Sequence, residues 1–497
     1  MKFKKENICR WAWYAAVFAF IYIWFTRVHP LVLFDADDWN YASYIRRAWP
    51  IWKDWNPSRV FPEIFMPFVC NLSVRLLYPA TGDYLGAITA GTAFVIAVSV
   101  TVYVCSFDRL VHRLFRLSAP RSIAVSLVFV MFHFLAMRSF LAANQYLFYC
   151  WDLTCYYFYL IPSLLNASLV MWMSHHAWAD GFRGGKQPLL MGVCLLLVYL
   201  AIFSNLPSSG ILAAFAGCRT LLAMIRGFRK TTLNDFLRET GAYIGILLMW
   251  LVSAVFELSG GRAGSTSGTM LENGLEVLKF LSHPTMYCGK VFLLYSFVIL
   301  ASMVLILFFA KKRTEWDENM WSVTLEIAVC GAALLVYTVL MTAKVGYSFI
   351  YRSEYLFGLF FYLILLITTA LAYITVKYPR VFTVMPIVMC LMASSLNTPW
   401  QTYKDSNIEN TDAATCRRIS NDLIEQVIQA DTQGASTLDL YVPVSDKDGN
   451  WPHYSGKQGI AISHTLFEHG VISREIEVTV IPTEEMNEKY SVGYHYG

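Results

Sequence analysis

Three carboxylates fall within four residues, directly after the first long apolar run: Asp35, Asp37 and Asp38, followed by Trp39. Ionised groups at a membrane edge need partners. Placing three of them there costs more free energy than the few polar residues that usually end a membrane span. One carboxylate could accept a proton from an attacking hydroxyl, because repulsion from a neighbouring carboxylate favours uptake of a proton. The three could instead hold a divalent cation, Mg²⁺ or Mn²⁺, that neutralises a phosphate leaving group. The plainer alternative is that acids simply begin an outer loop.

Basic residues recur between later apolar runs, and together they predict an anionic ligand. They are Arg59, Arg138, Arg262, Lys344 and Arg352. The planar fork of arginine suits phosphate oxygens, so a lipid phosphate at membrane depth is the natural candidate. Taken singly, each side chain could instead extend its charged end to lipid headgroups.

Aromatic residues are concentrated between 146 and 159, where Tyr157 is the residue we single out. Such a cluster could offer a platform for a sugar ring or an isoprenoid chain. The alternative is an interfacial belt, because tyrosine and tryptophan are enriched where a membrane meets water. Two further substrate-binding candidates lie close to basic residues in the sequence: Glu63 and Tyr351.

The composition of the 497 residues indicates the environment in which these groups must work. Apolar residues make up 56% and charged residues only 15%, with a mean hydropathy of +0.46. A soluble globular chain carries about 25% charge, so the sequence predicts an all-α polytopic membrane protein. The small net charge of +4 says little about partners. The sequence shows neither a basic stripe nor a glycine-rich phosphate loop, so no nucleic-acid partner is expected. The eleven cysteines show neither a CxxC pair nor the spacing of a metal site.

Apolar runs of about 17 to 25 residues mark helices that are able to cross the hydrocarbon core. Eleven are predicted, at 11–33, 83–105, 122–140, 157–174, 188–204, 208–225, 240–256, 291–310, 322–343, 355–376 and 381–397. The first is expected to be a retained span rather than a cleaved signal, because it is long and aromatic. Residues 188–225 form either a tight hairpin or one kinked passage. The segment 62–79 carries Arg75 and flanking prolines, so it is expected to be re-entrant or interfacial.

Lysine and arginine in the short loops predict the orientation of the chain. The N-terminus and every second loop are basic, which assigns them to the cytoplasm. The alternate loops then face outward, and the longest of them, from about 34 to 82, carries the acidic cluster. An odd number of spans also puts the C-terminal tail outside.

Beyond about residue 400 the charge rises and the apolar runs shorten, as in a soluble module. Residues 408–430 and 459–467 are predicted as helices, whereas 437–444 and 475–481 alternate as strands. The predicted domains are therefore a transmembrane domain at 1–398 and a small extracytoplasmic α/β domain at 399–497.

This layout resembles the GT-C class of membrane glycosyltransferases. The closer resemblance is to bacterial polytopic enzymes related to serotype-specific O-antigen glucosyltransferases and cell-wall glycopolymer glycosylation. The matching features are Asp37-Asp38-Trp39, Arg59 with Pro62, Tyr157 with Pro162, Gly261-Arg262, Tyr351-Arg352 and Pro399-Trp400. Where such relatives often show a Trp-x-x-Gly element, this chain has Trp151-Asp152-Leu153-Thr154.

The resemblance implies a polyprenyl-phosphate-linked sugar as donor, entering from the outer leaflet of a bacterial cytoplasmic membrane among its lipids. The phosphate would be bound by basic residues of the outward loops, namely Arg262 and Arg352 with Lys344 or Arg138. Asp37 or Asp38 would deprotonate a hydroxyl of an extracytoplasmic glycan in a single, inverting displacement. A retaining double displacement would need a nucleophile in addition.

Two other functions are alternatives to glycosyl transfer. A transporter or flippase for a lipid-linked saccharide would need charged residues along a pathway at mid-membrane depth, usually in repeated halves. The sequence shows neither feature. A glycan polymerase or ligase would also work at the outer face, but such enzymes are typically rich in arginine and lack an early acidic cluster.

Overall fold

The computed structural model describes residues 2–34, 36–43, 57–138, 146–150, 152–174, 188–227, 232–258, 268–310, 313–395, 412–444 and 456–492. Packing divides the chain into two compact units. The first comprises Met1–Val17, Ser99–Tyr149 and Tyr159–Tyr403, and the second comprises Phe18–Val98, Cys150–Phe158 and Lys404–Gly497. The boundary predicted at residue 398 follows composition, whereas packing groups Phe18–Val98 with the C-terminal module.

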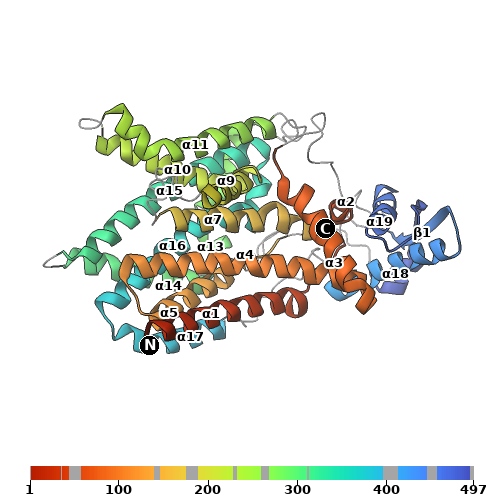
Figure 1. Ribbon diagram of the computed structural model, residues 1–497, viewed down its shortest axis with the longest axis horizontal. Coiled ribbons are helices and arrows are strands. Elements are labelled where there is room, and N and C mark those ends of the chain that lie inside the picture. The colour runs from red at the N-terminus through yellow and green to blue at the C-terminus, as the bar shows by residue number, and fades with distance from the viewer. Residues whose placement is uncertain are drawn as a thin grey trace. The chain divides into compact units, whose positions relative to one another are not determined.

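Helices dominate the described residues (Figure 1). The apolar ones are α1 (Lys2–Ile23) with the π-helical η1 (Trp24–Val28), α4 (Tyr84–Phe115), α5 (Ala119–Leu135), η4 (Tyr156–Leu160) with α7 (Ile161–Met173), α9 (Pro188–Ile202), α10 (Leu206–Gly227), α11 (Leu233–Leu258), α14 (Lys290–Phe308), α15 (Glu315–Val345), α16 (Ser353–Lys377) and α17 (Val381–Ser395). Each of the eleven predicted apolar runs coincides with one of these helical stretches.

Nine helices in the described part of the chain are long and apolar enough to cross a membrane. Eight of them match predicted spans, and the ninth is Phe61–Thr81. Three predicted spans are shorter helices, Ala119–Leu135, Met191–Ile202 and Val381–Ser395. The chain is thus a mostly helical, multi-pass protein, as predicted, but not all eleven predicted spans reach full length among the described residues.

The segment Phe61–Thr81 consists of η3 (Phe61–Phe65) and α3 (Met66–Thr81). Asn71 Nδ2 and Arg75 Nη2 both donate to the backbone carbonyl of Glu468 in the C-terminal module, at 3.0 and 3.2 Å. A charged side chain bonded to a soluble element is costly to place in hydrocarbon. These contacts favour the predicted re-entrant or interfacial position of this segment over a crossing.

The predicted break within 188–225 separates two helices, α9 and α10, which pack on each other. Helix α9 ends at Ile202 and α10 begins at Leu206. Asn205 Oδ1 accepts a hydrogen bond from Ser208 N at 2.9 Å and so caps the start of α10. The hairpin interpretation therefore holds, rather than one kinked passage.

Helix α16 is the central helix of the first unit and packs against α15, α5, α14, α10 and α7. Its sequence is apolar on nearly every face, which is the pattern of a helix surrounded by others. Packing is close at Gly358, where an added Cβ would lie 2.8 Å from Cδ2 of Leu334 and 2.9 Å from Cγ1 of Ile211. A glycine there lets α15 and α10 approach α16 closely.

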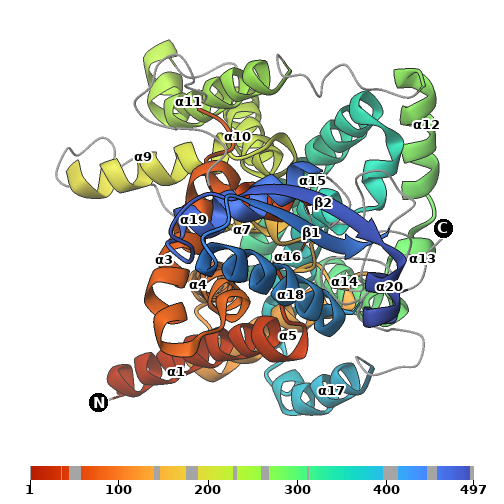
Figure 2. The same ribbon diagram turned by 90° about the vertical axis from the view of Figure 1, so that its right-hand side faces the viewer.

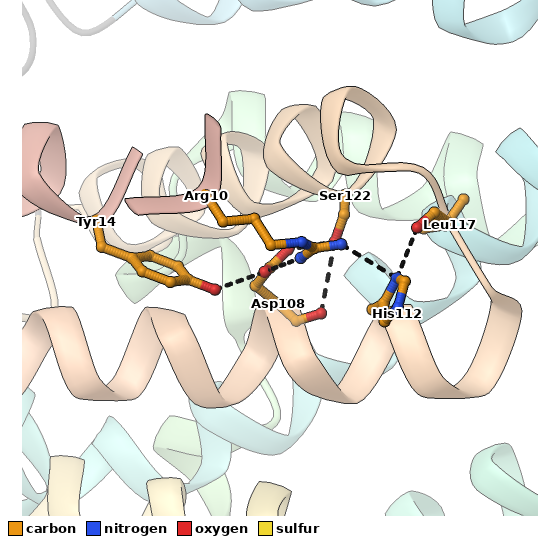
Figure 3. A network of polar contacts seen from close by, with 6 residues as sticks. All are labelled: Arg10, Tyr14, Asp108, His112, Leu117 and Ser122. Carbon is orange, nitrogen blue, oxygen red and sulfur yellow. Dashed lines mark hydrogen bonds and ion pairs between the residues drawn. The ribbon is translucent and has the colours of Figure 1, made fainter. Parts of the chain in front are cut away.

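A buried carboxylate, Asp108 of α4, fixes the start of α1 within the first unit (Figure 3). Arg10 forms an ion pair with Asp108, and Tyr14 Oη donates to Asp108 Oδ2 at 2.6 Å. Ser122 of α5 donates to the other carboxylate oxygen. Both oxygens are therefore paired, which offsets the cost of burying the charge.

Ion pairs also join helices elsewhere in this unit. Lys377 Nζ lies 2.8 Å from Asp317 Oδ2 and joins the end of α16 to the start of α15. Arg219 Nε of α10 lies 3.0 Å from Glu326 Oε1 of α15. These helix-borne charges thus have partners of opposite sign.

The C-terminal module, in the second unit, alternates helices and strands as the sequence predicted. Its elements are α18 (Ala413–Thr432), β1 (Thr437–Pro443), α19 (Gly456–Glu468), β2 (Glu477–Thr483) and α20 (Glu484–Tyr490). The strands pair in parallel, with Leu440 opposite Val480, and Figure 2 shows them side by side in blue. Leu440 and Val442 are buried whereas Asp439 and Tyr441 are exposed, so one face of β1 packs on α18.

Candidate functional site

The acidic cluster opens a seven-residue helix, α2 (Ala36–Ala42), in the second unit. Asp37 and Asp38 occupy its first turn, where carboxylates interact favourably with the helix dipole. Asp37 is exposed, whereas Asp38 is fully buried. Asp35 lies outside the described residues. The two neighbouring acids therefore have different surroundings and are suited to different tasks.

Asp38 is held by hydrogen bonds on both carboxylate oxygens. Its Oδ1 accepts from the backbone N and from Oγ1 of Thr154, each at 2.8 Å. Its Oδ2 accepts from Phe34 N at 3.2 Å. Hydrogen bonds to an ionised acceptor are among the stronger ones in proteins, so Asp38 ties α2 firmly to residues 152–155.

Thr154 is in position because Asp152 caps the short helix α6 (Leu153–Cys155). Asp152 Oδ1 accepts from Cys155 N at 2.5 Å and Oδ2 accepts from Cys155 Sγ at 3.4 Å. This turn orients both donors of Thr154 toward Asp38. Sequence reasoning missed Thr154, although an aspartate two residues before it is a recognisable N-cap signal.

Arg59 and Glu63 lie at the start of η3, which continues into α3, and α3 packs against α2. Arg59 has a φ of 61°, a left-handed conformation that a non-glycine residue adopts at a cost of order 1–3 kcal/mol. Its carbonyl accepts from Glu63 N at 3.2 Å. Arg59 is half-buried and Glu63 is buried. Backbone strain of this kind at a non-glycine residue often marks a functional site.

Tyr157 is fully buried in the second unit. Its hydroxyl lies 3.2 Å from Thr92 Oγ1, and its ring lies 6.2 Å from that of Phe65. The neighbouring Tyr156 is also fully buried. In this structure these two rings pack in the interior rather than forming an exposed platform.

Four of the predicted basic-site residues belong to the first unit: Arg138, Lys344, Tyr351 and Arg352. Lys344 is exposed in the last turn of α15, where a cation is favoured by the helix dipole. Arg352 is half-buried, directly before α16, with its guanidinium 5.2 Å from the ring centre of Phe349. Arg262 lies outside the described residues.

Aromatic contacts link Arg138 to Tyr351 within that unit. Arg138 N donates to Tyr287 O at 2.8 Å. The Tyr287 ring stacks 4.7 Å from Phe280 of α12 (Met270–Leu281), and Phe280 meets Tyr351 edge-on at 5.0 Å. Tyr351 ends η6 (Tyr347–Tyr351), which packs against the ends of α15 and α16. Packing thus gathers these basic and aromatic candidates around one set of helix ends.

The candidates therefore form two groups. The second unit holds the acidic group, which consists of Asp37, Asp38, Arg59, Glu63 and Tyr157. The first unit holds the basic group, which consists of Arg138, Lys344, Tyr351 and Arg352. In the part of the chain that the structure describes, no cluster of three or more histidine, cysteine, aspartate or glutamate residues could bind a metal ion. The Mg²⁺ or Mn²⁺ site predicted at Asp35, Asp37 and Asp38 includes a residue beyond those described.

Compared with models of known protein families, with curated proteins and with solved structures, the chain matches none of them. Its function must therefore be argued from its own residues and from the resemblance of its motifs.

Proposed function

We propose that this protein is a membrane glycosyltransferase that moves a sugar from a polyprenyl-phosphate donor to an extracytoplasmic glycan. The observation that carries the proposal is the contrast between the exposed Asp37 and the adjacent, fully hydrogen-bonded Asp38. One acid is accessible to a substrate, and its neighbour anchors the segment that presents it. This is the arrangement that a single positioned general base requires.

Asp37 is the base in this proposal. Its carboxylate takes the proton of an acceptor hydroxyl while the acceptor oxygen bonds to the anomeric carbon. The bond from that carbon to the phosphate oxygen breaks at the same time, and polyprenyl phosphate leaves with the bonding electrons. The displacement inverts the anomeric centre, because no covalent intermediate on the enzyme intervenes. Asp38 acts as a positioning residue, because both of its oxygens already accept hydrogen bonds.

The basic group supplies the phosphate site in this proposal. Arg352 offers two parallel donors to phosphate oxygens, and Lys344 and Arg138 add positive charge. Each group is held by hydrogen bonds within its own unit. Ser353 Oγ donates to Tyr149 O at 3.1 Å in the first unit, and Thr154 holds Asp38 in the second.

The proposal places the chain in a bacterial cytoplasmic membrane with Asp37 facing outward, as the distribution of lysine and arginine predicts. Transport of a lipid-linked saccharide is the main rival. The charges within α4, α10 and α15 described above lie in ion pairs. Ion pairing explains why these charged residues lie within helices, so a transport pathway is not needed to explain them.

The test uses full-length protein in lipid nanodiscs with a synthetic polyprenyl-phosphate sugar and a glycan acceptor. Asp37→Asn should reduce transfer by about 10²–10⁴-fold, the usual contribution of a general base. Asp439→Asn is the matched control, because it neutralises an exposed aspartate in β1 and should leave transfer unchanged. Wild-type transfer by both Asp37→Asn and Asp38→Asn would overturn the proposal.

A further inference from the structure

Side chains of the C-terminal module donate hydrogen bonds to backbone carbonyls of the acidic segment in three places. Ser420 Oγ of α18 donates to Leu33 O at 3.2 Å. Thr465 Oγ1 of α19 donates to Trp39 O at 3.0 Å. His469, directly after α19, places Nε2 3.1 Å from Ala42 O. The three carbonyls lie on both sides of Asp37 and Asp38, so the module holds the segment before and after the two acids.

His469 is held in one orientation by a second bond. Its Nδ1 lies 2.8 Å from Tyr84 Oη at the start of α4. A carbonyl can only accept, so Nε2 carries the proton toward Ala42 O, and Nδ1 accepts from the tyrosine hydroxyl. Burial lowers the pKa of His469 from 6.5 to about 4, which keeps the ring neutral and this pattern intact at neutral pH.

The module is fixed to the neighbouring helices as well. Glu468 O, at the end of α19, accepts from Asn71 and Arg75 of α3. Arg417 of α18 forms an ion pair with Asp83, directly before α4. Trp39 is fully buried and stacks on Tyr84, with ring centres 6.3 Å apart. The module, α2, α3 and the start of α4 are therefore joined by specific polar contacts.

Helix α2 needs such support because it is only seven residues long. Helices shorter than about 12–15 residues are marginal in water, since a few hydrogen bonds do not offset the cost of nucleation. The bonds to Trp39 O and Ala42 O satisfy carbonyls in α2 that the helix itself leaves without an intrahelical partner. The conformation of the acidic segment thus depends on groups that lie 387 to 427 positions away in the sequence.

We propose that the C-terminal module positions the acidic segment, with His469 and Thr465 as the positioning residues that hold Asp37 and Asp38 in their working arrangement. The catalytic part of this inference rests on the proposed function. The physical part of the inference is that these side chains set the conformation of α2, and it is independent of the proposed function.

Hydrogen exchange on the full-length protein in nanodiscs tests the physical part directly. The variants are Thr465→Val, which keeps the shape and removes the hydroxyl, and His469→Ala, which removes both ring bonds. Each should speed exchange of the α2 amides by about tenfold, the factor expected for loss of a buried hydrogen bond. His469→Gln can still donate from its amide and should recover part of the protection. Exchange in α16 should stay unchanged.

Ser473→Ala is the matched control. It removes the 2.7 Å hydrogen bond that Ser473 Oγ donates to Asp431 Oδ1 within the module, and touches none of the carbonyls of 33–42. This variant should leave α2 exchange at the wild-type rate. If His469→Ala proves unfolded, Thr465→Val alone decides the outcome. Wild-type α2 exchange in a folded Thr465→Val variant would overturn the proposal.

Transfer measurements then separate the two proposals. Thr465→Val should lower kcat with little change in the donor KM, because it displaces the base without touching the phosphate site. If Asp37→Asn and Asp38→Asn both keep full activity while the exchange results hold, the proposed function fails and the positioning role stands. If Asp37→Asn is inactive while α2 exchange is unaffected by the module variants, the positioning role alone fails.

Discussion

Thr154 donates two hydrogen bonds, from its backbone N and its hydroxyl, to a single oxygen of Asp38, 116 positions earlier in the chain. Neither residue is exposed, and both bonds are 2.8 Å long. The pair joins α2 to α6 within the second unit. Asp38 is thereby committed to holding the segment, which leaves Asp37 as the acid that a substrate can reach.

Replacement of Thr154 tests whether Asp38 holds the segment that presents Asp37. Thr154→Val keeps the side-chain shape and the backbone bond but removes the hydroxyl donor. We expect the free energy of unfolding to fall by about 1–2 kcal/mol, because a charged, buried acceptor loses one of its donors. Transfer should also fall, since α2 is less firmly held.

Thermal unfolding and transfer rates on the purified protein measure both effects. Thr154→Ser keeps the hydroxyl and should stay close to wild type in both. Equal behaviour of the valine and serine variants would show that the hydroxyl contributes nothing.

Replacement of Arg352 tests the phosphate site. Arg352→Ala should raise the KM for the polyprenyl-phosphate donor by about tenfold or more, because hydrogen bonds to a charged group contribute about 1.5–3 kcal/mol. Arg352→Lys should recover only part of this affinity, since a lysine lacks the planar fork. Steady-state kinetics with varied donor measures the change.

Arg380→Ala provides the control on the same helix. Arg352 precedes α16 and the exposed Arg380 follows it, at opposite ends of 25 helical residues. A helix of that length spans about 37 Å. The donor KM should therefore not respond to Arg380→Ala, and an equal rise in both variants would point to a general effect of charge.

The pH dependence of stability should report His469. Burial, opposed in part by the bond to Ala42 O, lowers its folded-state pKa from 6.5 to about 4, and the nearby Arg75 and His464 act in the same direction as burial. The folded protein therefore binds fewer protons than the unfolded chain between these values. The contribution of neutral His469 to the free energy of unfolding is complete above pH 6.5. It is lost progressively as the pH falls toward 4, by roughly 3 kcal/mol in total.

Chemical unfolding of wild type and His469→Gln between pH 4 and 8 measures this contribution. The glutamine variant does not titrate in this range, so its stability should fall less steeply below pH 6.5. Parallel curves for the two proteins would assign the pH dependence to other groups.

The buried ion pair of Arg10 and Asp108 should matter for stability but not for the donor KM. Arg10→Met leaves the Asp108 carboxylate buried without its guanidinium and should cost about 3–5 kcal/mol, as expected when one partner of a buried pair is removed. Arg10→Met with Asp108→Leu removes both charges and should recover most of that loss. Thermal unfolding in detergent compares the three proteins, and a double variant no better than Arg10→Met would contradict this account.

Much of the secondary structure follows from the sequence, because helix and strand leave local patterns. Uninterrupted apolar runs predicted α14 and α16, and alternation at 437–444 predicted β1. Composition alone identified a multi-pass chain, since so few charges cannot cover a soluble fold of this size. The break at Asn205 was likewise visible as a polar interruption between two apolar runs.

Tertiary structure decided which of these patterns come together. Asp37 and Asp38 look alike in the sequence, and only burial and hydrogen bonding in the fold distinguish Asp38 from Asp37. Thr154, Thr465 and His469 are ordinary residues in their own segments, because a hydrogen bond across hundreds of positions leaves no local periodicity. Composition divides the chain near residue 398, whereas packing joins the C-terminal module to the acidic segment. That union depends on complementary donors and carbonyls, and only folding brings these into contact.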